Sequence, residues 1–164
     1  GSRGALMYRD YDILANGQPV GESVSAWVLA SLQGHRLLRL GTIAELAETS
    51  GGALCKTMTL AKLHQPEGLR HKENRLMRYS DTDLNGHVNN TRYADFACDA
   101  LELEGMPEDR FLAEMQIGYL AECRPGDCLD IQVGGKGDSR YVCGVDESGK
   151  SRFESALFFG ELLP

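Results

Sequence analysis

The sequence lacks paired cysteines, an excess of basic residues and any long apolar run, and each absence excludes a class of protein. Its five cysteines are an odd number without a Cys-x-x-Cys pair, so neither a disulfide framework nor a zinc site is indicated. The formal net charge of −7 argues against general nucleic-acid binding, which requires a basic footprint. The longest apolar run, around residues 26–32, is far shorter than the roughly 18 residues that span a bilayer.

What is present is the composition of a soluble globular protein, with 42% apolar and 25% charged residues. The length of 164 residues suits one ordinary domain, or one and a half small ones. Unpaired cysteines, together with no visible secretory signal, predict a reducing cytoplasm. We expect no cofactor, no metal, and no nucleic-acid or membrane partner.

The first part of the chain predicts a β-hairpin followed by a connector. Asn16-Gly17 is a strong hairpin turn signal between two runs that contain β-branched and aromatic residues. Thr42 and Glu45 have capping-box spacing, which predicts one or two helical turns. The expected elements are strands at 7–14 and 22–32, helical turns at 42–48 and a connector at 50–70.

The second part predicts a strand, one long helix and four further strands. Five residues with apolar or aromatic side chains recur at helical spacing and form one stripe, capped at its start by Asn89 or Asn90. Such a helix must bury its stripe against the sheet, so we expect an α+β fold in which an antiparallel sheet wraps around a central helix. The stripe is Tyr93, Phe96, Ala97, Ala100 and Leu101; the expected helix is 90–104, and the expected strands are 75–80, 111–123, 127–134, 139–146 and 151–160.

A weak internal repeat links the two parts. Tyr11 matches Tyr141, and Ser25-Ala26 match Ser155-Ala156, at a constant offset of 130 residues. Chance is one explanation of so few matches. If the repeat is real, the first 40 or so residues are the closing hairpin of an earlier copy of the second part.

The stretch RYSDTDLNGHVNNTRY, residues 78–93, concentrates small polar groups just before the predicted helix. On an extended chain, Asp83, Asn85 and His87 would face the same side. A carboxylate, an amide and an imidazole together suit attack by water on a thioester, whose thiolate leaves readily. The same residues are equally typical of a turn followed by a helix cap, because Asn-Gly favours turns and Asn caps helices.

Two stretches resemble a known family. DTDLNGHVNNTRY resembles the signature of the hotdog-fold acyl-ACP thioesterases of plants and bacteria, Asp-x-Asn-x-His-Val-Asn-Asn followed by an aromatic residue. IGYLAECRPGD, residues 117–127, resembles the family's strand in which an aliphatic residue and a tyrosine precede Glu-Cys. The resemblance implies catalytic roles for Asp83, Asn85, His87 and Glu122.

Cys123 matches a cysteine proposed in the family as a nucleophile. Neighbours on a regular strand point to opposite faces, so Glu122 and Cys123 cannot both face the site unless the strand is bulged. We favour Glu122, because a thiolate would need its own base and an electropositive setting. Asp83 also matches the catalytic aspartate of small single-hotdog acyl-CoA thioesterases, which leaves a structural role for Asp81.

The resemblance implies a thioesterase that releases free fatty acid and holo-ACP from acyl-ACP in fatty-acid biosynthesis. An acyl-CoA thioesterase and a catalytically impaired acyl-binding remnant are the alternatives. Family members carry two hotdog units, so we expect a complete unit at 67–164 and a remnant of a first unit at 1–66. A single hotdog usually needs a partner for its sheet edge, which predicts a homodimer.

A basic run precedes the motif, comprising Arg70, His71, Lys72, Arg75 and Arg78. It is either a solvated approach to a strand or a landing patch for the acidic acyl carrier protein.

Overall fold

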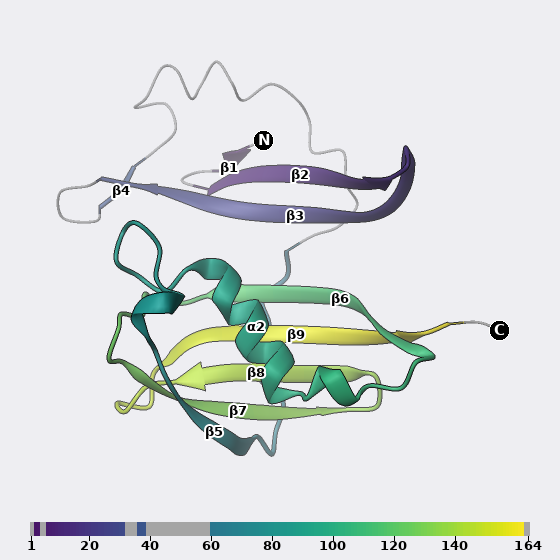
Figure 1. The fold of residues 1–164 in the computed structure, drawn as a ribbon. Helices are drawn as coiled ribbons and strands as arrows, with labels where there is room; N and C mark the ends of the chain where they lie inside the picture. The colour runs from purple at the N-terminus through teal and green to yellow at the C-terminus, as the bar shows by residue number, and fades with distance from the viewer. Residues whose placement is uncertain (1, 4–5, 32–35, 39–59, 163–164) are drawn as a thin grey trace. The chain divides into compact units, whose positions relative to one another are not determined.

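The computed structural model describes residues 2–3, 6–31, 36–38 and 60–162, and the chain divides into two compact units, residues 1–62 and 63–164 (Figure 1). The first unit contains strands β1 (Ser2–Arg3), β2 (Leu6–Ala15), β3 (Gln18–Ala30) and β4 (Leu37–Leu38). The second contains β5 (Arg70–Leu76), η2 (Tyr79–Asp81), α2 (Asn90–Ala100), η3 (Leu103–Gly105), β6 (Arg110–Tyr119), β7 (Cys128–Lys136), β8 (Ser139–Val145) and β9 (Ser151–Glu161).

The first unit is built around the predicted hairpin. Strands β2 and β3 pair antiparallel along their length, within the strand order β1-β2-β3-β4. Asn16 and Gly17 have φ angles of 51° and 77°, the left-handed pair that a two-residue hairpin turn requires. The hairpin prediction is therefore confirmed. The predicted helical turns at 42–48 and most of the predicted connector lie outside the described residues.

The pairing register does not follow the repeat of 130 residues. Tyr11 pairs with Ser23, whereas Tyr141 pairs with Ala156, which lies three positions beyond the residue that corresponds to Ser23. The register of a hairpin is set by its turn, and β2–β3 closes through two residues whereas β8–β9 closes through a longer loop. Both segments form hairpins, but the matched residues are not equivalent in their ladders.

The second unit is a five-stranded antiparallel sheet of order β5-β7-β8-β9-β6 with α2 lying across it (Figure 1). Four residues of the predicted stripe are buried and Leu101 packs at the edge of the same core. Tyr93 packs on Phe153 of β9, with ring centroids 5.0 Å apart, and the sheet contributes Leu129, Ile131, Val142 and Leu157. The α+β prediction and the helix stripe are confirmed.

Several element boundaries differ from those predicted. The helix ends at Ala100 rather than 104, because Glu102 takes a left-handed backbone with φ 55°. The strand before the motif lies at 70–76 rather than 75–80, since Met77 bonds instead to the loop that contains Gly126. Strand β7 begins at Cys128 rather than 127 and runs to Lys136 rather than ending at 134. In the part of the chain that the structure describes, no helix has the length and apolarity to cross a membrane.

The strand predicted at 111–123 also ends early. Strand β6 stops at Tyr119, and the N–H groups of Leu120 and Ala121 both donate to the carbonyl of Arg152. Two successive donors on one carbonyl break the regular ladder. Residues 120–127 therefore form a loop that leaves the sheet, and this loop carries Glu122.

Candidate active site

The motif forms a closed turn rather than an extended strand. The N–H of Asp83 donates to the carbonyl of His87 at 2.9 Å, and the N–H of Gly86 donates to the carbonyl of Asp83 at 3.1 Å. Gly86 has φ 74°, a left-handed conformation that side chains disfavour, and this allows the chain to reverse. The predicted alternation of three side chains along an extended chain is therefore wrong.

Within this turn, Asp83 holds Asn85. One carboxylate oxygen of Asp83 accepts the backbone N–H of Asn85 at 2.8 Å, which is an Asx turn. The other lies 3.5 Å from the side-chain amide nitrogen of Asn85. Asn85 is exposed, so its amide can donate to a group outside the turn. Asp83 thus fixes Asn85 directly and the backbone of His87 through its own N–H.

Glu122 reaches the motif from the loop after β6. The N–H of Val88 donates to the carbonyl of Cys123 at 2.8 Å, which joins the two segments. Nε2 of His87 then lies 3.2 Å from a carboxylate oxygen of Glu122. Arg152 supports the loop by donating to the carbonyl of Glu122 at 3.1 Å. Two stretches that are distant in the sequence thus meet at a carboxylate–imidazole pair.

Glu122 and its neighbour Cys123 face opposite directions. The Glu122 side chain is 57% exposed, whereas Cys123 is fully buried in the core. Burial raises the pKa of the Cys123 thiol, although its contact with the hydroxyl of Tyr93 opposes the shift. Because the thiolate is the nucleophilic form, this environment disfavours Cys123 as a nucleophile.

The remaining polar residues of the motif hold the backbone in place. Asp81 is buried; it accepts the N–H of Arg78 at 2.8 Å and pairs with Arg92 at 3.2 Å. The side-chain oxygen of Asn89 accepts the N–H of Thr91 at 2.9 Å, so Asn89 rather than Asn90 caps the helix. The turn-and-cap interpretation thus describes the backbone of the motif.

Three members of the basic run contact carboxylates within the second unit. His71 lies 2.5 Å from Asp130, and Lys72 lies 2.6 Å from Glu102. Arg75 contacts Glu73 at 2.7 Å and Asp99 at 3.0 Å, and the residue also lies over the ring of Phe96. These pairs reduce the charge that the run presents to an acidic partner.

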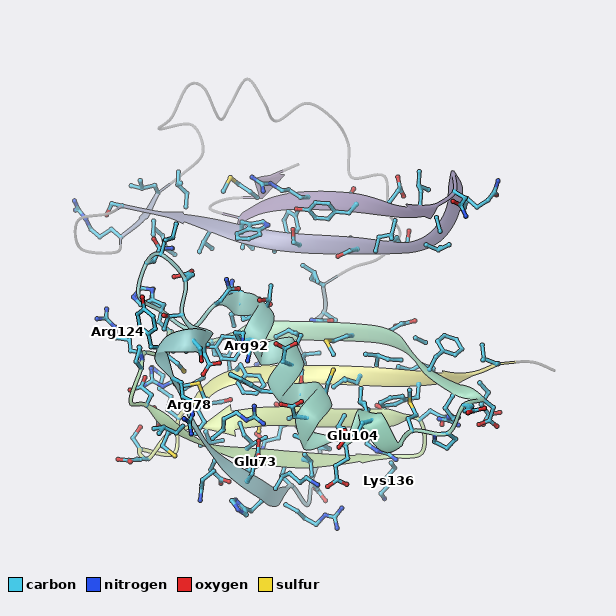
Figure 2. The ribbon with its side chains drawn as sticks, viewed as in Figure 1. Glu73, Arg78, Arg92, Glu104, Arg124 and Lys136 are labelled. Carbon is cyan, nitrogen blue, oxygen red and sulfur yellow. The ribbon has the colours of Figure 1, made fainter. Side chains whose placement is uncertain are left out.

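One residue of the site, Arg124, was not predicted from the sequence. Nη2 of Arg124 lies 3.2 Å from Nε2 of His87, the same nitrogen that faces Glu122. Figure 2 shows Arg124, Arg92 and Arg78 toward the end of the second unit where α2 begins, and Glu104 and Lys136 toward the other end. The only available signal was the position of Arg124 directly after Glu-Cys.

Carboxylate, imidazole and amide groups at this site can move protons and bind a carbonyl oxygen. Over the described ranges, the structure contains no group of three or more His, Cys, Asp or Glu side chains that could hold a metal ion.

Comparison with known proteins shows which family and which solved structures the chain is similar to. The family model for the acyl-ACP thioesterase C-terminal domain matches residues 66–154. An acyl-ACP thioesterase from Bacteroides thetaiotaomicron has a similar fold, with a TM-score of 0.82 and 19% identity. The 12:0-ACP thioesterase from Umbellularia californica has a TM-score of 0.78 and 19% identity. Each comparison covers 98% of this chain and 65% of the other, so the chain spans about two thirds of their length.

A Staphylococcus aureus protein solved in complex with CoA is similar over 56% of this chain and 76% of its own, with a TM-score of 0.50 and 15% identity. No curated protein matches the chain. At these identities the structural likeness establishes the hotdog fold that the sequence predicted.

Proposed function

The chain belongs to the acyl-ACP thioesterase family, and we propose that it hydrolyses acyl-ACP thioesters to free fatty acid and holo-ACP in fatty-acid biosynthesis. The observation that carries the proposal is the 3.2 Å contact between His87 and Glu122 beside the turn that holds Asn85. This arrangement offers a base for water and a donor for a carbonyl oxygen in one place.

In the proposed reaction, Glu122 is oriented by His87 and takes a proton from water. The water oxygen attacks the carbonyl carbon, and the exposed amide of Asn85 donates to the oxygen that becomes negative. The carbon–sulfur bond then breaks, and the thiolate takes the proton held by the Glu122–His87 pair. The products are a carboxylic acid and the thiol of the carrier arm. A thiol with a pKa of about 8.5 leaves without strong acid assistance.

Asp83 acts in this scheme by holding Asn85 and the backbone of His87, or by sharing the role of the base. Its two carboxylate oxygens both face Asn85, and its N–H is bonded to His87. Removing this carboxylate would free the turn that places both groups. We therefore expect Asp83 to matter as much as Glu122.

Hydrolysis of matched acyl-ACP and acyl-CoA substrates tests the proposal. If the chain is active, Asp83→Ala and Glu122→Ala should each lower kcat by a factor of about 100 or more. Glu147→Ala, which removes an exposed carboxylate from the loop between β8 and β9, is the matched control and should keep the wild-type rate. Wild-type rates in both site variants would refute the assignment.

The same assay separates the alternatives. Hydrolysis of acyl-CoA and not of acyl-ACP would favour an acyl-CoA thioesterase, an alternative supported by the similarity to a protein that was solved with CoA. Turnover of neither substrate by a folded chain would leave an acyl-binding remnant.

We also propose that the chain forms a homodimer. Strand β6 is an edge of the five-stranded sheet, and an edge strand presents backbone N–H and C=O groups to another chain. Two aromatic residues of this strand, Phe111 and Tyr119, are 40% and 50% exposed. Light scattering at micromolar concentration should give twice the mass of the chain, and a monomer would contradict this.

The assignment of residues 1–66 to a remnant of a first hotdog unit, and of 67–164 to a complete unit, is also proposed. The hairpin of the first unit and the match of the family model from residue 66 support it. Free cysteines in the second unit agree with a cytoplasmic location.

A further inference from the structure

Arg152, the second residue of β9, contacts the loop that carries Glu122 with both its backbone and its side chain. Its carbonyl accepts the N–H groups of Leu120 at 2.9 Å and of Ala121 at 3.1 Å. Its guanidinium nitrogen Nη1 donates to the carbonyl of Glu122 at 3.1 Å. One residue of β9 thus holds three successive residues of the loop, and the last of these is the one whose carboxylate faces His87.

The guanidinium of Arg152 is held in turn by Asp146, the residue that directly follows β8. Nε of Arg152 lies 2.8 Å from one carboxylate oxygen of Asp146. The other oxygen accepts the hydroxyl of Ser148 at 2.6 Å and the N–H groups of Ser148 and Lys150, each at 2.9 Å. The Ser148 hydroxyl, the Lys150 N–H and the Arg152 guanidinium together lower the pKa of Asp146 to about 2. The carboxylate therefore stays charged near neutral pH and keeps its hold on the guanidinium.

The backbone contacts and the side-chain contact of Arg152 fix different features of the loop. The hydrogen bonds from Leu120 and Ala121 fix where along the loop Glu122 lies. A planar peptide group can still rotate between its two Cα atoms, and donation from the guanidinium fixes the direction in which the Glu122 carbonyl points. The Glu122 side chain is 57% exposed, so packing contributes little to its orientation. The orientation of its backbone therefore matters for whether its carboxylate meets His87.

We propose that Asp146 and Arg152 are positioning residues for Glu122. The inference rests on the proposed function, because that function makes Glu122 the base. The carboxylate of Asp146 aligns the guanidinium, the guanidinium fixes the peptide group of Glu122, and the carboxylate of Glu122 then lies beside His87. Both positioning residues act on catalysis through Glu122 and not by contact with the substrate.

A double-mutant cycle tests whether Arg152 acts through Glu122. With the rest of the chain as wild type, Arg152→Gln should lower kcat by about tenfold or more and change KM by less than about twofold, because it disturbs the base and not the binding of substrate. In the Glu122→Ala background the same substitution should have no further effect, since the group that it positions is gone. A loss of the same size in both backgrounds would mean that Arg152 only supports the fold, and this would overturn the inference.

Two milder variants grade the effect. Arg152→Lys keeps a charged donor but lacks the planar group that reaches Asp146 and Glu122 together, so it should retain part of the wild-type kcat. Asp146→Asn should lower kcat by a smaller factor than Arg152→Gln, because the guanidinium keeps its bond to the carbonyl. A wild-type kcat in Asp146→Asn would contradict the role assigned to Asp146.

Arg140→Gln is the matched control. Arg140 also donates to backbone carbonyls, those of Gly137 and Ser139, but it does so at the turn between β7 and β8. Its substitution removes the same kind of contact from a turn that carries no residue of the site. We expect Arg140→Gln to keep the wild-type kcat, and a loss as large as that of Arg152→Gln would contradict a specific role for Arg152.

A second measurement does not depend on turnover. The chain has four histidines, so the imidazole nitrogens of His87 can be assigned in 15N NMR spectra by substituting it. Glu122→Gln should shift the Nε2 resonance of His87, because it removes a charge 3.2 Å away. The same substitution should cause a much smaller shift in the Arg152→Gln background, where the carboxylate is no longer held beside the imidazole. Equal shifts in the two backgrounds would overturn the inference.

The two measurements separate a failure of the inference from a failure of the proposed function. If no thioester is hydrolysed but the response of Nε2 to Glu122→Gln depends on Arg152, the proposed function fails and the positioning of Glu122 stands. If thioesters are hydrolysed but Arg152→Gln changes neither kcat nor that response, the proposed function stands and the inference is wrong.

Discussion

The hairpins β2–β3 and β8–β9 share a strand–turn–strand pattern but differ in what covers them. In β8–β9, Val142 and Phe153 are fully buried under α2. In β2–β3, Ile13 and Val20 are 51% and 62% exposed, and no described helix belongs to that unit. Strand pattern and turn chemistry are therefore enough to form a hairpin, whereas a core requires a second layer. The motif lies in the unit whose described residues include that layer.

Separating the two units should have the largest effect. We expect residues 63–164 alone to unfold in one cooperative transition, because the described core lies within them. Residues 1–62 alone should show none, since no helix among their described residues covers the sheet, and a sheet without a covering layer is marginally stable. Urea titration of residues 63–164 is followed by circular dichroism. The same titration of residues 1–62 is followed by the fluorescence of the single tryptophan, Trp27. A cooperative transition of 1–62 would break the comparison.

Substituting one aromatic residue in each unit tests the difference between the two hairpins further. Phe153→Ala should lower the free energy of unfolding by about 3–5 kcal/mol, because it leaves a cavity beside Tyr93. Trp27→Ala should change it by about 1 kcal/mol or less, since that side chain is 44% exposed and loses one hydrogen bond to Ser25 and a cation–π contact with Arg9. Chemical denaturation followed at 222 nm compares the two. Similar losses would mean that Trp27 belongs to a core of its own.

The smallest effect concerns the cap of α2, the helix that covers the sheet of the second unit. Asn89→Ala should lower the free energy of unfolding by about 1 kcal/mol, because it removes the acceptor of the Thr91 N–H. Asn90→Ala is the matched control and should be neutral within about 0.5 kcal/mol, as its side chain caps nothing. Thermal denaturation of both variants measures this, and a larger loss in Asn90→Ala would contradict the assigned cap.

The sequence predicted what depends on local patterns. The Asn16-Gly17 turn, the helix stripe from Tyr93 to Leu101 and the cap before Thr91 follow from periodicity and from backbone preferences that a few neighbours determine. The early end of β6 did not follow, because it depends on the carbonyl of Arg152 in a distant strand. Bonds between remote segments leave no local pattern.

For the candidate site too, some features were predicted from the sequence and others were not. The residue types at Asp83, Asn85 and His87 pointed to acid–base chemistry, but their extended arrangement was wrong, because the hydrogen bonds of Asp83 and Gly86 close a turn. That Glu122 shares a site with His87 was predicted from the family resemblance and not from the spacing of the residues. Arg124 was missed altogether, since its partner is chosen by how the loop after β6 meets the motif.

The hydrogen bond from Val88 to Cys123 has a consequence for insertions and deletions. It fixes the loop after β6 to the motif just after Glu122, while the hydrogen bonds of Leu120 and Ala121 to the carbonyl of Arg152 fix the loop to β9 just before Glu122. Between these two points, a residue added or removed would move Glu122 past His87 by the length of one residue, about 3.3 Å. Length changes in the loop at 146–150 would spare that spacing. The length of the loop after β6 thus defines the site as much as its composition does.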